Sequence, residues 1–249
     1  MYGYGGNVLR IDLTGGTLHR HPTEEHLARA YLGGRGLNVK RLWDELPAHT
    51  GGLSPDNLLV FGLGPLVGTT FPGGARFNVS AMSPQTGILG DSNAGGFFGP
   101  ELKYAGYDQI IVHGRAEYPV YLWICDDLVE LRDARAFWGM DVWDTTAAIH
   151  QKVGDTGVQV ATIGQGAENG VRFAGVFANL VRTAARTGMG TVMASKNLKA
   201  VVVRGSGSFP VADMARFQEI IERLDSIIYD HPEYEVRYRL GTTKLINAL

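Results

Sequence analysis

The fold is decided by two glycine-rich stretches, Asn93-Ala-Gly-Gly-Phe-Phe-Gly-Pro-Glu-Leu-Lys103 and Arg182-Thr-Ala-Ala-Arg-Thr-Gly-Met-Gly-Thr-Val-Met-Ala-Ser-Lys-Asn-Leu-Lys199. Each stretch runs into a short apolar segment that ends in glycine, at 109–114 and 200–205. Glycine lets a backbone approach a ligand closely, and a helix that follows offers unpaired N–H groups to an anion. Two such loops predict a ligand with two anionic ends, or two copies of one ligand.

The rest of the chain repeats one order of elements around these loops, over about 5–115 and about 118–205. The order is strand, strand, helix, strand, strand, glycine loop with helix, strand. The matched segments are the hairpins 8–20 and 120–132, the helices 23–33 and 144–154, and the strand pairs 58–64 with 159–166 and 75–79 with 171–175. We expect Thr23 to cap the first helix. The duplication predicts an α+β fold of two similar β-sheets with helices, related by an approximate two-fold axis, with both glycine loops facing a common site.

Composition excludes several classes of protein. The 249 residues include 34 glycines, about twice the usual share, and carry a net charge of −2, which gives no case for nucleic acid or an acidic membrane surface. The single cysteine, Cys125, excludes a disulfide framework and a cysteine-ligated cluster within this chain. The longest apolar run, 58–68, is too short to span a membrane, and no signal peptide is visible, so we expect a cytoplasmic protein.

Residues 209–249 depart from the repeat. Asp213 to about Tyr229 has the pattern of an amphipathic helix, and Asp230-His-Pro232 stops it. We therefore expect a domain over 1–208, followed at 209–249 by the helical start of a further domain that is truncated here.

Arginines beside the glycine loops are the best candidates for anion contacts. Arg182 and Arg186 lie four residues apart before Gly188, so a helical turn or compact loop would converge them on a phosphate. Arg76 and Arg172 occupy matched places in the two repeats, each before a phenylalanine. A ligand contact and a strand arginine that covers its aromatic neighbour are equally open for them.

Two other glycine segments are weaker candidates. The segment 62–68 resembles a loose dinucleotide fingerprint, but Pro65 argues against a following helix, and a turn between strands is the better interpretation. The segment 33–36 is open between a helix C-cap and a ligand contact. No nucleophile–base pair stands out, so the pattern is typical of a surface that binds a cofactor.

At these segments the chain resembles the N-terminal domain of the aldehyde:ferredoxin oxidoreductase family, the tungsten-pterin enzymes. The resemblance covers Met1 to about Gly205. The segments that carry it are Tyr31-Leu-Gly-Gly-Arg-Gly-Leu37, Leu53-Ser-Pro-Asp-Asn-Leu58, Gly64-Pro-Leu-Val-Gly-Thr69, Arg76-Phe-Asn-Val79, Ser83-Pro-Gln-Thr-Gly87, Asn93-Ala-Gly-Gly96, Glu101-Leu-Lys-Tyr-Ala-Gly-Tyr-Asp108, Gly166-Ala-Glu-Asn169 and Ser195-Lys-Asn-Leu-Lys-Ala200. So many motifs in one order are highly specific.

The resemblance implies a double-sheet base that carries a tungsten (or molybdenum) cofactor with two pterins. The implied pterin contacts are Arg76, Asn93, Gly95, Arg182, Thr183, Ala185 and Arg186. The backbone carbonyls of Asn93 and Thr183 would bind a magnesium ion that bridges the pterin phosphates. The family usually carries glycine at the positions of Ala185, Thr187 and Ala194, and a Cβ at 185 or 187 would demand a different backbone path.

The ligands of the family's [4Fe–4S] cluster and its substrate-pocket residues lie beyond Leu249. The resemblance therefore implies that C-terminal domains or a partner subunit carry the cluster, with ferredoxin as electron acceptor, and it leaves a homodimer open. The complete enzyme is expected to oxidise aldehydes to carboxylates, while this chain holds no catalytic residue and is expected to be inactive alone. Two alternatives stay open: a benzoyl-coenzyme A reductase-like branch of the family, and a non-catalytic or degenerate pterin-binding subunit.

Overall fold

The computed structural model describes residues 1–247, which fall into two compact units. The larger unit comprises Met1–Thr69 and Gly73–Pro210, and the smaller one comprises Thr70–Pro72 and the residues from Val211 onward. No helix in the described part of the chain is both long enough and apolar enough to cross a membrane.

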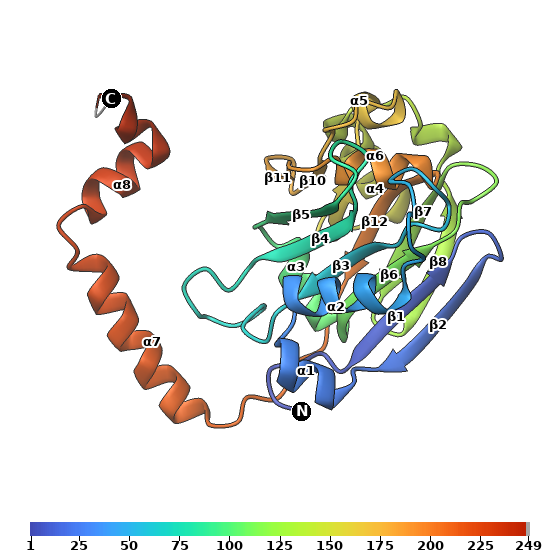
Figure 1. The fold of residues 1–249 in the computed structure, drawn as a ribbon. Helices are drawn as coiled ribbons and strands as arrows, with labels where there is room; N and C mark the ends of the chain where they lie inside the picture. The colour runs from blue at the N-terminus through green and yellow to red at the C-terminus, as the bar shows by residue number, and fades with distance from the viewer. Residues whose placement is uncertain (248–249) are drawn as a thin grey trace. The chain divides into compact units, whose positions relative to one another are not determined.

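The larger unit is built on two six-stranded sheets, whose strands have the orders β2-β1-β6-β3-β4-β5 and β8-β7-β12-β9-β10-β11 (Figure 1). The first sheet contains β1 (Asn7–Asp12), β2 (Thr17–Pro22), β3 (Leu59–Leu63), β4 (Phe77–Met82), β5 (Leu89–Ala94) and β6 (Tyr107–His113). The second contains β7 (Val120–Cys125), β8 (Leu128–Asp133), β9 (Gln159–Thr162), β10 (Val176–Ala178), β11 (Arg182–Ala184) and β12 (Leu198–Arg204). In each sheet only one pair, β1 with β6 or β7 with β12, is parallel. The predicted duplication and α+β fold are confirmed.

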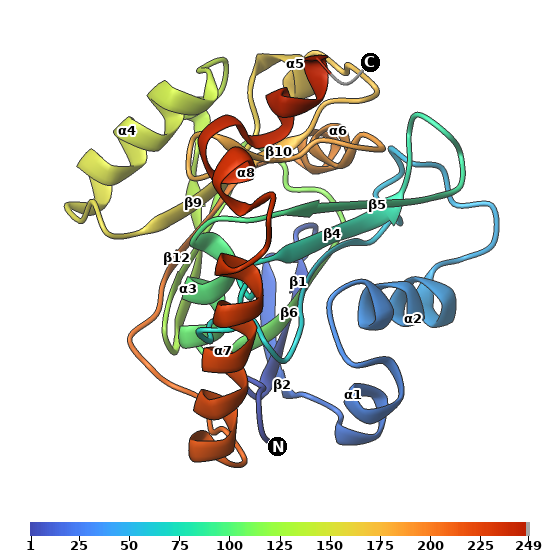
Figure 2. The ribbon, with the colours of Figure 1, turned by 90° about the vertical axis from the view of Figure 1, so that its left-hand side faces the viewer.

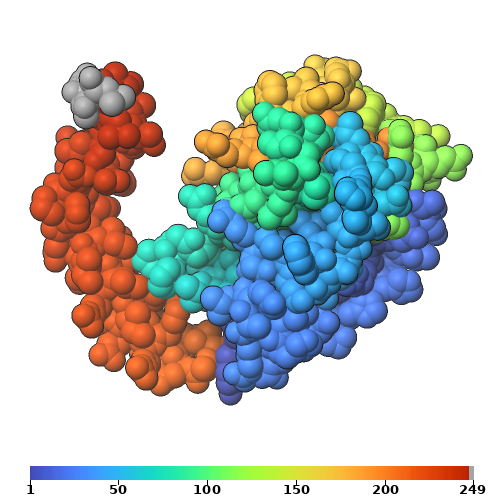
Figure 3. Space-filling model, viewed as in Figure 1, coloured from blue at the N-terminus to red at the C-terminus, as the bar shows by residue number. Residues whose placement is uncertain are grey.

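Helices form a layer between the sheets and cover their outer faces. The helices of the larger unit are α1 (Glu25–Tyr31), α2 (Arg35–Glu45), α3 (Phe98–Tyr104), α4 (Val142–Val153), α5 (Gln165–Glu168) and α6 (Met189–Ser195), with a 3₁₀ turn at Arg135–Phe137. Side chains of α3 and α6 share one buried core with both sheets, as Phe98 and Val192 do. Leu42 of α2 packs on the outer face of the first sheet, and Ile149 of α4 packs on that of the second, so α2 and α4 lie on opposite sides (Figure 2). The two repeats thus pack directly against each other, blue to green against yellow and orange (Figure 3).

The β-bulges of the two parallel pairs also match. The bulged residues are Asp108 in β6 and Lys199 in β12, which fall between paired neighbours at equivalent places. Both are buried and carry opposite charges, and each finds its counter-ion inside its own repeat: Lys103 lies 2.6 Å from Asp108, and Glu168 lies 2.5 Å from Lys199. Burial lowers the pKa of both lysines. Both repeats therefore have a buried ion pair at the bulge, but the bulged residue is the acid in the first repeat and the base in the second.

The predicted count of five strands in each repeat is wrong, because each glycine stretch begins inside a further strand: β5 ends at Ala94, and β11 spans Arg182–Ala184. Arg182 therefore lies on an extended edge strand, and the predicted helical turn or compact loop there is absent. The inward positions of β5 are occupied by Gly90, Ser92 and Ala94, so the strand shows no apolar alternation. A Cβ at Gly90 would lie 2.5 Å from Met189 Cε, which shows how closely α6 packs on this strand.

The predicted strand over 171–175 is also wrong, since β10 begins at Val176. Phe77 and Val176 are the first residues of β4 and β10, and they pair with Ala94 and Ala184. This register matches Arg76 with Gly175 and overturns the proposed match of Arg76 with Arg172.

The helix assignment changes in two ways. The sequence pattern missed α2, which follows α1 after a tight Gly33-Gly34 turn and is the helix that corresponds to α4 in covering a sheet. Thr23 is not the N-cap of α1: its hydroxyl donates to Asp108 at 2.7 Å, and α1 has no side-chain cap. The predicted end of the second helix at Gly154 is confirmed, with the glycine at φ 75°.

The smaller unit is helical. It contains α7 (Met214–Tyr229), α8 (Tyr234–Leu240) and the 3₁₀ segment Gly241–Asn247. The predicted helix from Asp213 to about Tyr229 is confirmed as α7, and the Asp213 carboxylate caps it by accepting from the backbone N–H of Arg216. The last two residues of the predicted segment 209–249 lie outside the described residues.

Candidate functional site

The two sheets meet along their edge strands β5 and β11, which lie beside each other in Figure 1. Just after β11, the backbone N–H of Arg186 donates a hydrogen bond to Ser92 Oγ of β5, at 3.1 Å. The two glycine stretches, far apart in sequence, therefore face one region at the junction of the repeats.

Each repeat also holds the glycine loop of the other. Ser83, which follows β4, donates its hydroxyl to the carbonyl of Thr187, which is 2.8 Å away and two residues before the start of α6. Asn179, which follows β10, accepts at Oδ1 from the N–H of Phe97, 2.8 Å away and directly before α3. These exchanged contacts fix the position of one loop relative to the other.

A cleft of about 390 Å³ opens at this junction, and we call it the arginine cleft. It is lined by Gly73, Ala75, Arg76, Asn93, Ala94, Gly95, Gly96, Val181, Arg182 and Thr183. Five of the seven residues implied as pterin contacts line it, namely Arg76, Asn93, Gly95, Arg182 and Thr183. No acidic residue is among the lining residues, and neither arginine side chain has a hydrogen bond or ion pair within residues 1–247. Two uncompensated cations in a glycine-lined cleft favour an anion.

A second pocket, of about 380 Å³, lies on the other side of Thr183, and we call it the apolar pocket. It is lined by Gly164, Gly166, Ala167, Val171, Phe173, Ala174, Gly175, Phe177, Thr183 and Ala185. Through the strand register it is the counterpart of the arginine cleft, with Gly175 at the place of Arg76. The duplication has thus produced one cationic and one apolar surface beside each other.

The remaining predicted residues lie around these two surfaces. Ala185 lines the apolar pocket, and Arg186 lines neither surface, although its backbone bonds to Ser92. Thr187 has a left-handed backbone, with φ 64°, which disfavours a β-branched residue. Glycine adopts this left-handed conformation without steric cost, which agrees with the glycine that the resemblance led us to expect at this position.

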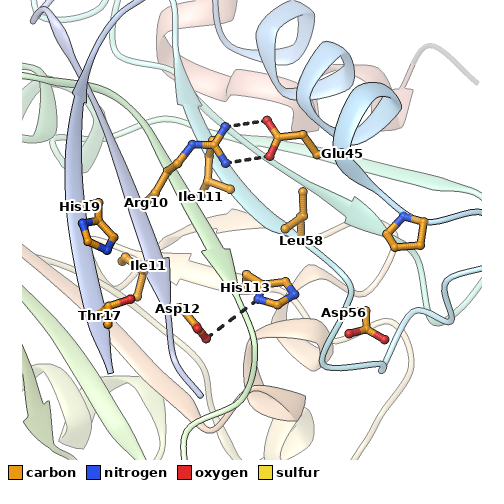
Figure 4. Close-up of a pocket in the computed structure, with 11 residues that line it drawn as sticks. Arg10, Ile11, Asp12, Thr17, His19, Glu45, Asp56, Leu58, Ile111 and His113 are labelled. Carbon is orange, nitrogen blue, oxygen red and sulfur yellow. Dashed lines mark hydrogen bonds and ion pairs between the residues drawn. The ribbon is translucent and has the colours of Figure 1, made fainter. Parts of the chain in front are cut away.

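A third pocket, of about 290 Å³, lies on the outer face of the first sheet (Figure 4). Arg10 and Glu45 form a bidentate pair across it, at 2.7 and 2.6 Å, and His113 Nδ1 lies 3.9 Å from Asp12. The hydrogen bond to Arg10 lowers the pKa of Glu45 although burial opposes it. No group of three or more His, Cys, Asp or Glu side chains in the described residues could hold a metal. Because its cation is already paired, this pocket is a poorer anion site than the arginine cleft.

Comparison with known proteins identifies the family to which this chain belongs. Residues 8–205 match the family described as aldehyde ferredoxin oxidoreductase, N-terminal domain. The chain belongs to the aldehyde ferredoxin oxidoreductase family. The resemblance seen in the sequence motifs is confirmed.

Three proteins similar in sequence to this chain each match more than four fifths of its residues. A tungsten-containing aldehyde ferredoxin oxidoreductase of Pyrococcus abyssi is 45% identical over 250 aligned residues, covering 100% of this chain and 41% of the relative. The WOR-like subunit of an aliphatic sulfonate oxidoreductase of Pyrococcus furiosus is 40% identical, covering 84% of this chain and 36% of the relative. The solved active-site complex BamBC of benzoyl coenzyme A reductase, with 1,5-dienoyl-CoA, matches with a TM-score of 0.88 and 43% identity, over 91% of this chain and 35% of that one. All of this chain aligns with the Pyrococcus abyssi relative, but the chain spans only about two fifths of that relative's length.

Proposed function

We propose that this chain is the pterin-binding base of a tungsten-dependent, or molybdenum-dependent, oxidoreductase that oxidises aldehydes to carboxylates with ferredoxin as electron acceptor. The arginine cleft supports this proposal, because Arg76 and Arg182 meet there at the junction of two repeats and neither has an ion pair within residues 1–247. The aldehyde and ferredoxin assignments rest on the relatives named tungsten-containing aldehyde ferredoxin oxidoreductase.

The residues present fit a pterin cofactor with phosphate groups. Gly95 has neither a positive φ nor any atom within 4 Å of the place where a Cβ would stand, so the fold itself does not require glycine there. Its missing side chain instead keeps the cleft open for close approach of a ligand. Arg76 and Arg182 then bind phosphate oxygens, and the apolar pocket excludes water beside them.

A bridging magnesium ion fits the edge strands. Asn93 and Thr183 lie on β5 and β11, each the edge strand of its sheet, and edge strands leave alternate backbone groups without a sheet partner. We propose that their carbonyls bind the ion, because carbonyl oxygens suit a hard cation. The tungsten bis-pterin supplies the redox chemistry when bound, and this chain supplies binding and orientation.

We further propose that residues 1–208 are this cofactor domain, that 209–249 begin the next domain, and that a [4Fe–4S] cluster is carried by further domains or a partner subunit. Cys125 alone could not ligate such a cluster. In this arrangement the chain by itself does not turn over substrate.

The test is the metal and pterin content of the protein expressed from its complete reading frame and purified anaerobically. We expect tungsten or molybdenum with releasable pterin, together with aldehyde-dependent reduction of ferredoxin. Protein that is folded but contains neither metal nor pterin would refute the proposal.

A second candidate is the benzoyl-coenzyme A reductase-like branch, which the match to BamBC at 43% identity supports. It keeps the cofactor site and changes the reaction. Turnover of an aryl-coenzyme A thioester without aldehyde oxidation would favour it. A degenerate pterin-binding subunit, suggested by the left-handed Thr187, would retain pterin and catalyse neither reaction.

A further inference from the structure

A chain of buried polar side chains on the outer face of the first sheet leads to the exposed side chain of Asn93, which lines the arginine cleft. It links Arg41 and Asn38 of α2, Gln109 of β6, Asn78 of β4 and Asn93 of β5. Gln109 and Asn38 are completely buried, and Asn78 is 2% exposed. A Cβ at Gly62 would lie 2.2 Å from Asn38 Oδ1, so this glycine makes room for the chain of amides. We call Arg41, Gln109, Asn38 and Asn78 the amide relay.

Every hydrogen bond in the relay points the same way. Arg41 Nε donates to Gln109 Oε1 at 3.4 Å, and Gln109 Nε2 donates to Asn38 Oδ1 at 2.8 Å. Asn38 Nδ2 donates to Asn78 Oδ1 at 2.9 Å, and Asn78 Nδ2 donates to Asn93 Oδ1 at 3.2 Å. The donors therefore run from the helix toward the cleft.

The two charged ends fix this direction. The Arg41 guanidinium has donors and no acceptor, so Gln109 must turn its oxygen toward it. At the other end Asn78 Nδ2 also donates to the carboxylate of Asp91, which only accepts and is itself held by Arg35 at 2.6 Å. An amide in between cannot flip without breaking a buried hydrogen bond.

The second repeat shows that the fold does not need this polar layer. Through the strand register, Gln109 corresponds to Ala200, Asn78 to Phe177, and Gly62 to Thr162. Ala200 belongs there to an apolar core beneath α4. Buried polar groups add less stability than apolar packing does, so the first repeat keeps them for another purpose.

We propose that the amide relay is a positioning device that orients the side chain of Asn93. With its Oδ1 held by Asn78, Asn93 turns Nδ2 toward the arginine cleft as a hydrogen-bond donor, and no group in residues 1–247 accepts from that nitrogen. The cleft thus selects a ligand group that accepts hydrogen bonds at this point, such as a phosphate or ring carbonyl oxygen. This inference rests on the proposed cofactor-binding function: the amide relay would orient the Asn93 side chain that contacts the cofactor.

The test is a double-mutant cycle on Asn78→Leu and Asn93→Ala in the protein purified with its cofactor. The measured quantity is the rate at which pterin, followed by its fluorescence after oxidation, and tungsten leave the protein. We expect each single variant to lose cofactor about tenfold faster, as for one hydrogen bond to a charged group, and the double variant to be no faster than Asn93→Ala. If the increases in the rate of cofactor loss from the two single variants multiply in the double variant, the proposal is overturned. It is also overturned if Asn78→Leu loses cofactor at the rate of the unmodified protein.

Two further variants separate positioning from folding. Gln109→Leu cuts the relay at its far end, where the second repeat already has an apolar residue, and we expect about threefold faster loss. Asn57→Leu is the matched control, because Asn57 is completely buried and hydrogen-bonded to Gly52 and Met82 without a link to the cleft. If Asn57→Leu accelerates cofactor loss as much as Asn78→Leu does, the relay has only a structural role.

Absence of cofactor from the unmodified protein would refute the proposed function and leave the relay to be decided by crystallography. In that cofactor-free protein we expect one Asn93 rotamer with Oδ1 on Asn78, and a displaced side chain in Asn78→Leu. An Asn93 side chain that is already disordered in the unmodified protein would overturn the relay.

Discussion

The buried side chain of Lys196 should make the free energy of unfolding depend on pH, by an amount that follows from the lowered pKa of this group. It is the residue after α6, its side chain is buried, and Nζ donates to the carbonyls of Pro55 at 3.0 Å and Gly114 at 3.1 Å. It therefore joins the second repeat to the first with no carboxylate of residues 1–247 in hydrogen-bond contact, and Asp56 is the opposing charge that acts on it. Burial lowers the pKa of Lys196 from 10.5 to about 8.

The sign follows from proton binding. Between the folded pKa of about 8 and the unfolded value of 10.5, the unfolded chain binds more protons at Lys196 than the folded chain does. The contribution of this group to the free energy of unfolding therefore rises with pH in that window. At 1.36 kcal/mol per pKa unit, the rise between pH 7 and pH 9.5 amounts to about 2 kcal/mol.

The assay is urea unfolding at both pH values for the unmodified protein and for Lys196→Met. Other groups titrate in both proteins, so the difference between them isolates Lys196. We expect the unmodified protein to gain about 2 kcal/mol relative to Lys196→Met on going to pH 9.5. A difference that is constant with pH, or that changes in the opposite direction, would refute the reasoning.

Three further substitutions, with Gly95→Ala as a comparison for one of them, test the packing of the larger unit, and each is measured by chemical unfolding. Asp108→Asn removes the counter-ion of the buried Lys103 and should lower the free energy of unfolding by about 3–5 kcal/mol; a cost below 1 kcal/mol would contradict the buried pair. Gly190→Ala places a Cβ 2.2 Å from the carbonyl oxygen of Gly175 and should cost about 2–3 kcal/mol, whereas Gly95→Ala meets no atom and should change only cofactor content; equal costs would refute this distinction. Thr187→Gly relieves a left-handed threonine and should stabilise the protein by about 0.5–1 kcal/mol, and any loss of stability would show that the hydroxyl matters more than the backbone.

The repeat was visible in the sequence because its hairpins, glycine loops and closing strands have strong local patterns. The edge strands β5 and β11 were not visible. The inward positions of β5 hold glycine, serine and alanine, and β11 has three residues, so neither gives an apolar alternation. α2 was missed because the Gly33-Gly34 turn between it and α1 resembles a helix end.

The arginines of the cleft were found from their nearness to glycines, and the family match added Asn93, Gly95 and Thr183. The amide relay could not be predicted from the sequence. Its residues lie on α2 and two strands, β4 and β6, and isolated asparagines and glutamines in a sequence do not reveal which of them are buried together. Likewise, the match of Arg76 with Gly175 depends on strand register, which spacing along the chain did not predict.

The central claim is that the arginine cleft binds the phosphate groups of a pterin cofactor. The most direct test is the tungsten and pterin content of the Arg76→Met/Arg182→Met double variant, purified anaerobically beside the unmodified protein and Arg115→Met. Arg115 also lacks an ion pair in the described residues and lines none of the three pockets, so it controls for the loss of positive charge. We expect the double variant to fold but to lose about nine tenths of its cofactor or more, while Arg115→Met keeps it. Full cofactor content in the double variant would show that these arginines do not bind the cofactor.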